Sequence, residues 1–180
     1  MKIGIDISQL AYEKTGVANY LRGLVEHLLE VDTENEYILF FSSLRNKLEV
    51  SNFNFLKEAK NKQVQIKTFK FPPSLLNILW NKMHVMPIEN LIGDVDVFIT
   101  SDWTEPPTKH AKKMTILYDL IVYKYPHETA QQIIETQKKK LHWVKKETTM
   151  ILCISEATKK DAKEILGIEE DRLAVVYPGV

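Results

Sequence analysis

The chain has 180 residues, enough for one substantial core and short enough to need no second, so we expect a single domain. Its content of 44% hydrophobic and 27% charged residues excludes the compositions that are typical of disordered chains. Lysine and arginine together number 24, as do aspartate and glutamate, so no overall positive charge attracts the molecule to nucleic acid.

The N-terminal sequence, MKIGIDISQL, places Asp6 within an apolar stretch and has no small-residue cleavage pattern, so we expect no signal peptide. No apolar segment approaches the roughly 20 residues needed to span a bilayer. The only cysteine, Cys153, lies in the apolar run MILCIS and is predicted to be a buried hydrophobe rather than a reactive thiol. We therefore expect a cytoplasmic protein.

Seven short runs rich in β-branched and aromatic residues predict strands. In chain order they are KIGIDI, EYILFFS, VQIKTFKF, VDVFITS, KMTILYDL, MILCIS and LAVVYP. Several are apolar at consecutive positions, as expected for strands that are covered on both faces. This pattern favours a parallel sheet.

Segments with helical spacing separate these runs. The first is predicted to begin near Thr15 and to end before the sequence DTENE. The second is predicted from Ser74 to Ile92, after the Pro72-Pro73 break, and Pro87 should end or kink it.

Two further helices follow in the second half of the chain. One covers about residues 127–149, and the other has Ser155 as its N-cap and Gly167 as its C-terminal stop. The less regular segment 43–62 is predicted to be a loop with a short helix. Strands alternating with helices predict a Rossmann-like, doubly wound α/β domain, with a mostly parallel sheet of about seven strands and helices on both faces.

A polar pair, Tyr118 and Asp119, interrupts the apolar run TILYDL at a predicted strand end. In an open parallel sheet, side chains at the carboxyl ends of strands face a crevice, so this pair is a candidate site. Tyr118 could exchange a hydrogen bond with a substrate hydroxyl, but it would be a poor general base. The alternative is a buried ring with a satisfied hydroxyl beside a carboxylate that caps a turn.

A second strand end carries the sequence TSDWTEPP, which contains Ser101, Asp102 and Trp103. Carbohydrate sites use this mixture, because an aromatic face packs on the C–H surface of a sugar while carboxylates accept its hydroxyl hydrogens. The alternative is a proline-stabilised loop with Trp103 in the core.

Gly16 lies near a helix start, where free backbone amides could receive a phosphate or another anion. Its surroundings have neither the G-x-G-x-x-G nor the Walker spacing, which disfavours classical dinucleotide or nucleoside triphosphate binding. Taken alone, Gly16 is better explained as a turn glycine.

The predicted helix over 127–149 concentrates cationic side chains around an aromatic ring, a pattern that attracts an anionic membrane surface. A solvated helix face is the alternative. The residues are Lys138, Lys139, Lys140, Trp143, Lys145 and Lys146. The five histidines have no metal-ligand spacing and no cysteine pair exists, so we expect no bound metal.

Several stretches resemble, in order along the chain, the N-terminal half of glycosyltransferase family four, which has the GT-B architecture. They are IGIDISQL, KTGVANYLRGLVEHLLEVDTENEYILF, DVFITSDWTEPP, TILYDLIVYKYP, CISEATKKDAKEILGI and RLAVVYPGV. The resemblance runs from Lys2 to Val180. It implies two Rossmann-type domains across a cleft, of which residues 1–180 would be the N-terminal, acceptor-side domain. The C-terminal domain, which binds the nucleotide sugar, would be absent from this chain.

The resemblance also implies roles for individual residues. Gly16 and the amide of Val17 would lie near the donor diphosphate. Tyr118 stands where many members have a histidine before Asp-Leu, so Tyr118 and Asp119 would lie at the reacting centre, although a phenol does not titrate near neutrality as histidine does. The acceptor side would be lined by Asp102, Trp103, Tyr118, Ser155 and Glu156.

The implied reaction is transfer of a hexosyl group from a nucleotide sugar to a hydroxyl of a glycan or glycolipid acceptor, with retention and without a metal or other cofactor. Such enzymes build cell-surface polysaccharides, lipopolysaccharides or glycolipids. We expect the 180-residue chain alone to be inactive. The alternative is a non-catalytic sugar- or nucleotide-binding α/β module.

Overall fold

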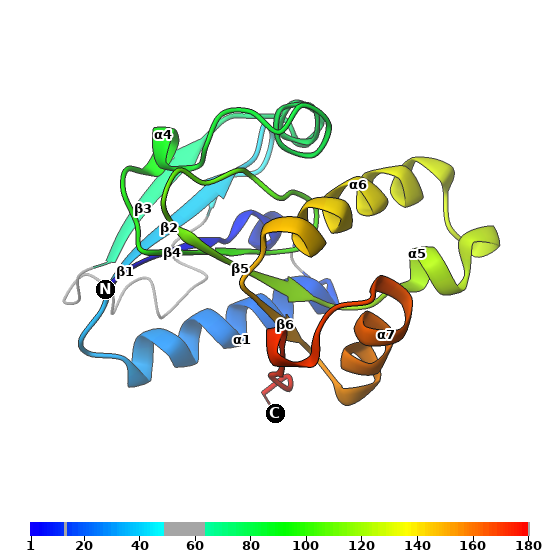
Figure 1. Ribbon diagram of the computed structural model, residues 1–180. Helices are drawn as coiled ribbons and strands as arrows, with labels where there is room; N and C mark the ends of the chain where they lie inside the picture. Colours follow the sequence, from blue (N-terminus) through cyan, green and yellow to red (C-terminus); the bar gives the residue numbers. More distant parts are fainter. Residues whose placement is uncertain (13, 49–63, 180) are drawn as a thin grey trace.

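A computed structural model describes residues 1–12, 14–48 and 64–179 of the protein. Its centre is a seven-stranded sheet in the order β3-β2-β1-β4-β5-β6-β7, in which all neighbouring strands are parallel. Helices pack on both faces of this sheet (Figure 1). The predicted Rossmann-like, doubly wound α/β fold is confirmed.

Each of the seven predicted strands is present. They are β1 (Lys2–Asp6), β2 (Glu36–Ser42), β3 (Val64–Phe69), β4 (Val97–Thr100), β5 (Lys112–Leu117), β6 (Met150–Cys153) and β7 (Leu173–Val175).

The central strand β1 pairs with β2 on one side and with β4 on the other. Gly4 is required at this position, because a Cβ there would lie 2.7 Å from Cδ2 of Phe98, its neighbour in β4. The strand order reverses between β1 and β4. In open α/β sheets such a switch point leaves a crevice outside the carboxyl ends of the two strands.

Helix α1 (Gly16–Val31) covers one face of β1 and β2. It begins where predicted, since the hydroxyl of Thr15 accepts a hydrogen bond from the amide of Ala18 and caps the helix. A short 3-10 helix, η1 (Ser8–Ala11), joins it to β1. Alternate side chains of β2 point to this face, and Leu39 is fully buried there.

The opposite face of β1 and β2 is covered by α3 (Pro73–Leu76), by the π-helix η4 (Asn77–Lys82) and by α4 (Glu89–Ile92). A helix was predicted from Ser74 to Ile92, with Pro87 ending or kinking it, whereas the structure divides this range into separate helical segments. The helical turns stop at Lys82, before Pro87, because His84 and Met86 both have positive φ angles. Trp80 of η4 is fully buried in this second core cluster.

The second half of the chain packs against β5, β6 and β7. Its helices are α5 (Ile121–Lys124), η5 (Pro126–Glu128), α6 (Gln131–Glu147), α7 (Glu156–Leu166) and η6 (Glu170–Arg172). The predicted cap at Ser155 and the stop at Gly167, which has φ +65°, are both confirmed. Burial raises the pKa of the Cys153 thiol to about 11, as expected for an unreactive core cysteine.

In the described ranges, no helix combines the length and apolar character needed to cross a membrane. The predicted short helix within segment 43–62 falls mainly on residues that lie outside those ranges.

Candidate functional site

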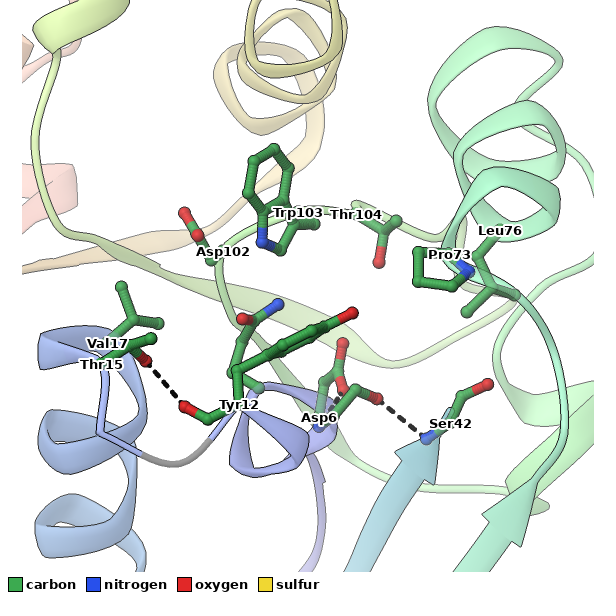
Figure 2. A pocket seen from close by; sticks show the side chains of 12 residues that line it. Asp6, Tyr12, Thr15, Val17, Ser42, Pro73, Leu76, Asp102, Trp103 and Thr104 are labelled. Atoms are coloured by element: carbon green, nitrogen blue, oxygen red, sulfur yellow. Dashed lines mark hydrogen bonds between the residues drawn. The ribbon is translucent and has the colours of Figure 1, made fainter. Parts of the chain in front are cut away.

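A cavity of about 500 Å³ opens at the switch point of the sheet. We call it the switch-point cavity. Figure 2 shows side chains from the end of β1, the start of α1, the end of β2, the start of α3 and the loop after β4 surrounding it. They are Asp6, Ser8, Gln9, Tyr12, Thr15, Val17, Ser42, Pro73, Leu76, Asp102, Trp103 and Thr104.

Asp6, the last residue of β1, is a functional candidate that the sequence analysis did not select. Asp6 is only 7% exposed, and this burial raises the pKa of its carboxyl. Hydrogen bonding from Ser8 lowers that pKa but does not cancel the rise. The amide of Ser8 donates to Asp6 Oδ1 at 2.9 Å. A signal was available, since a carboxylate that ends a buried strand at a switch point faces the crevice.

Asp102 and Trp103, both predicted as acceptor residues, line the switch-point cavity. The side-chain amide of Gln137, on α6, donates from Nε2 to both the backbone carbonyl and the Oδ1 of Asp102, each at 3.2 Å. Burial raises the pKa of Asp102, while the charge of Lys140 and the bond from Gln137 oppose that rise. Asn81 donates to the carbonyl of Trp103 at 2.8 Å, so the loop is held from two helices.

Tyr118 and Asp119 follow β5 directly, as predicted. Tyr118 is only 8% exposed, its hydroxyl lies 3.2 Å from Oγ of Ser101, and burial raises the pKa of its phenol well above the usual range. Asp119 is exposed, and its Oδ1 accepts from the amide of Ile121 at 3.0 Å. Both features of the alternative interpretation, a partnered buried ring and a turn-capping carboxylate, are therefore present.

These residues lie in adjoining cavities rather than in one groove. Tyr118 and Asp119 line a cavity of about 200 Å³ together with Asp102 and Trp103, which we call the strand-end cavity. They also line a cavity of about 560 Å³ together with Gly16 and Val17, which we call the α1 cavity. Since Val17 also lines the switch-point cavity, the structure brings all six of these predicted residues to one edge of the sheet.

The remaining two predicted acceptor residues are placed differently. The hydroxyl of Ser155 accepts from the amide of Thr158 at 3.1 Å and caps α7. Glu156 is exposed in the first turn of α7. Neither side chain lines one of the three cavities.

One residue of the predicted membrane-facing set is misassigned. Lys140 is 2% exposed and its ammonium donates to the carbonyl of Ser101, so it cannot face a membrane. The helical pattern misled the prediction because Lys140 lies beside the buried stripe of Ile134, Leu141 and Val144. Trp143 is half-buried and stacks on His84 with ring centroids 3.6 Å apart.

The sequence analysis also missed a polar cluster beneath the loop after β4. Glu105 is fully buried and accepts hydrogen bonds from Thr100 at 2.6 Å and Thr148 at 3.2 Å. Lys113, also buried, lies 3.5 Å from Glu105 and 2.8 Å from Glu147. We call these residues the Glu105 cluster.

Within the described part of the chain, no group of three or more histidine, cysteine, aspartate or glutamate side chains is arranged to hold a metal ion. The side chains that line the switch-point cavity include carboxylates, which accept hydrogen bonds, hydroxyls, which donate or accept them, and aromatic rings.

No known family model matches the sequence, and a search of curated proteins found no match. Among solved structures, a glycosyltransferase from Rickettsia africae ESF-5 superimposes with a TM-score of 0.52 at 15% sequence identity, over 99% of this chain. The chain has a glycosyltransferase-like fold. It spans 43% of the length of that glycosyltransferase.

Two other solved structures are similar at lower TM-scores. A short-chain dehydrogenase from Oenococcus oeni PSU-1 gives a TM-score of 0.40 at 11% identity and covers 99% of this chain and 96% of its own. The NADH-dependent reductase A1-R' in complex with NAD gives a TM-score of 0.38 at 10% identity, with coverages of 99% and 78%.

Proposed function

We propose that this chain is the acceptor-binding domain of a retaining glycosyltransferase of family four with the GT-B architecture. The full protein would move a hexosyl group from a nucleotide sugar to a hydroxyl of a glycan or glycolipid. The observation that carries this proposal is the switch-point cavity, where two carboxylates, Asp6 and Asp102, line the same space as the rings of Tyr12 and Trp103. The glycosyltransferase-like fold supports it.

The chemistry of the cavity suits a sugar better than a dinucleotide. Carboxylates accept hydrogen bonds from sugar hydroxyls, and aromatic faces pack on sugar C–H surfaces. A pyrophosphate would instead be repelled by Asp6, which stands at the end of β1 where dinucleotide-binding proteins have a glycine-rich turn. The start of α1, with Gly16 and Val17, remains the proposed position of the donor diphosphate.

The 180-residue chain is proposed to need a second domain for turnover. A departing nucleoside diphosphate requires positive potential, and the only buried lysines described here, Lys113 and Lys140, both donate to groups of this domain. We therefore propose that the nucleotide sugar binds chiefly to a C-terminal domain, without a metal cofactor. The span of 43% of the similar glycosyltransferase is in keeping with this division.

The test is a screen of nucleotide-sugar donors and glycan acceptors with the full-length protein, using the 180-residue chain as the control. We expect transfer by the full-length protein and none by the shorter chain. Turnover by the 180-residue chain alone would contradict the proposed division of labour, and inactivity of the full-length protein with every donor would count against the enzyme.

A non-catalytic sugar- or nucleotide-binding module is the second candidate function. It is favoured by Tyr118, because a buried phenol with a raised pKa stands where the resembling family often has a titratable histidine. Calorimetry separates the two candidates. A module would bind a glycan or nucleotide sugar without releasing nucleoside diphosphate during a prolonged incubation, whereas an enzyme would release it.

We further propose a peripheral contact with the inner face of a membrane, through Lys138, Lys139, Lys145 and Lys146 around Trp143. These lysines would attract anionic lipid by roughly 1 kcal/mol each near the surface. Sedimentation with vesicles of phosphatidylcholine, with and without phosphatidylserine, tests it. Equal binding to neutral and anionic vesicles would remove its electrostatic basis.

A further inference from the structure

Lys140 is almost completely buried, and none of the ion pairs among the described residues includes it. Lysine is rarely buried unless it is paired, because desolvation strongly disfavours its charged form. Here the ammonium donates to the backbone carbonyl of Ser101, and its side chain lines the strand-end cavity. Lys140 is therefore a buried cation that lines a cavity and also holds the main chain of the candidate site.

Helix α6 contacts the loop after β4 at two points. Gln137 and Lys140 are three residues apart and therefore share a helix face. Gln137 donates to Asp102, and Lys140 donates to the carbonyl of the preceding residue, Ser101. Together they fix the peptide that presents Asp102 to both the switch-point cavity and the strand-end cavity.

Three buried or half-buried carboxylates act on Lys140 by charge, namely Glu105, Asp102 and Asp6. Glu105 already has its own cation, since Lys113 lies 3.5 Å away, and threonine hydroxyls donate to it. The charges of Asp102 and Asp6 are not compensated in this way. Among the described residues, Lys140 is the buried cation left to balance these two carboxylates.

We infer that Lys140 is a positioning residue, which holds the Ser101–Asp102 peptide and serves as the internal counter-charge for Asp102 and Asp6 at the switch-point cavity. Only the consequence of this inference for the acceptor, given next, rests on the proposed function. When both carboxylates are ionised, hydroxyl or amine donors of the acceptor suit this cavity, and phosphate or carboxylate groups are repelled.

Titration of the aspartate side chains by carbon-13 NMR tests the inference without any ligand. We compare the wild-type chain with Lys140→Met and with a matched control on the same helix, Lys139→Met. In Lys140→Met the charged forms of Asp102 and Asp6 lose their counter-charge, so the pKa of each carboxyl is expected to rise. In Lys139→Met both are expected to stay at their wild-type values.

A reciprocal variant decides the question if Lys140→Met does not fold. Asp102 is half-exposed, so Asp102→Asn is expected to fold, and the pKa of the Lys140 ammonium should then fall below its wild-type value. Wild-type titration of Asp102 in folded Lys140→Met, or of Lys140 in Asp102→Asn, would overturn the inference. Because no substrate is used, this result is independent of whether glycosyl transfer is found.

Discussion

Two groups of carboxylates, around Asp102 and around Glu105, both include residues of the loop after β4, and they differ in how completely the protein satisfies their hydrogen-bonding capacity. In the Glu105 cluster, the carboxylate is fully buried and is bonded by threonines and by Lys113. At the switch-point cavity, the described hydrogen bonds to Asp6 come from Ser8, and those to Asp102 come from Gln137. In the Glu105 cluster, the hydrogen bonds of the carboxylate stabilise the fold. At the switch-point cavity, carboxylate oxygens of Asp6 and Asp102 face an open space.

Burial and charge alone do not identify a functional site in this protein. By residue type, Glu105 and Lys113 form the more conspicuous pair, yet their partners are all internal. Buried pairs of this kind are costly to break but are weak evidence for function. An incompletely partnered carboxylate that lines a cavity is the stronger functional signal.

The largest expected effect is on stability, in the Glu105 cluster. Glu105→Leu leaves threonine hydroxyls without their acceptor and removes one of the two carboxylates beside the buried Lys113, so the free energy of unfolding should fall by about 3–5 kcal/mol. Urea denaturation measures it. Glu105→Gln, which can still accept hydrogen bonds, should lose less. A loss below about 1 kcal/mol for Glu105→Leu would show that the cluster is not structural.

The next effect is on function, at the switch-point cavity. Asp102→Asn should reduce transfer by the full-length protein roughly tenfold to a hundredfold, because a charged acceptor for a sugar hydroxyl is replaced by a neutral one. Its stability should fall less than that of Glu105→Leu, because Asp102 is half-buried and an asparagine there can still accept the hydrogen bond from Gln137. Steady-state kinetics and urea denaturation on the same sample check both. A variant that is unstable but fully active would reverse the roles assigned to the two groups.

Asp6 gives a pH-dependent version of the same comparison. Burial raises the pKa of Asp6 in the folded protein, so the folded state binds its proton more tightly than the unfolded chain does. This residue therefore lowers stability as the pH rises through the folded pKa. Asp6→Asn removes that cost and should be more stable than wild type by about 0.5–2 kcal/mol at neutral pH.

The advantage of Asp6→Asn should vanish below the pKa of an unfolded aspartate, about 4, because wild-type Asp6 is then protonated in both states. Urea denaturation across this range measures the difference. Asp94→Asn, which changes an exposed aspartate, is the control and should show no such dependence. A pH-independent advantage would mean that the effect of Asp6→Asn does not arise from ionisation.

The smallest effect is expected at Tyr118. Tyr118→Phe removes the hydroxyl that lies 3.2 Å from Oγ of Ser101, which should cost about 1 kcal/mol of stability. Because that hydroxyl already has an internal partner, transfer by the full-length protein should fall less than in Asp102→Asn. Parallel kinetics of the two variants measure the order. A larger loss in Tyr118→Phe would assign the phenol a direct role in the reaction.

Much of the fold follows from local signals in the sequence. The strand EYILFFS coincides with β2, because its unbroken apolar character matches burial on both faces. The helix start near Thr15, the cap at Ser155 and the stop at Gly167 depend on local chemistry and were predicted correctly. The helix predicted from Ser74 to Ile92 failed because a π-helix and two positive φ angles have no such signature.

The candidate site was less predictable, because it depends on contacts between distant segments. Asp102, Trp103 and Tyr118 were selected because they follow strands, and that rule depends only on the parallel sheet. Asp6 was overlooked because it lies within an apolar stretch, KIGIDI, which was interpreted only as a strand. Lys140 was grouped with exposed lysines because only the path of α6 past the loop after β4 shows that it reaches Ser101.

The central position of β1 has a consequence for folding during synthesis. Ile3 pairs with Tyr37 in β2 but also with Val97 in β4, so one edge of the first strand stays unpaired until the ribosome has made more than half of residues 1–180. Contacts between such distant segments slow folding and prolong the exposure of apolar strand edges. The unpaired edge of β1 should therefore be where a nascent chain most needs a chaperone. The switch-point cavity opens at the same boundary between β1 and β4.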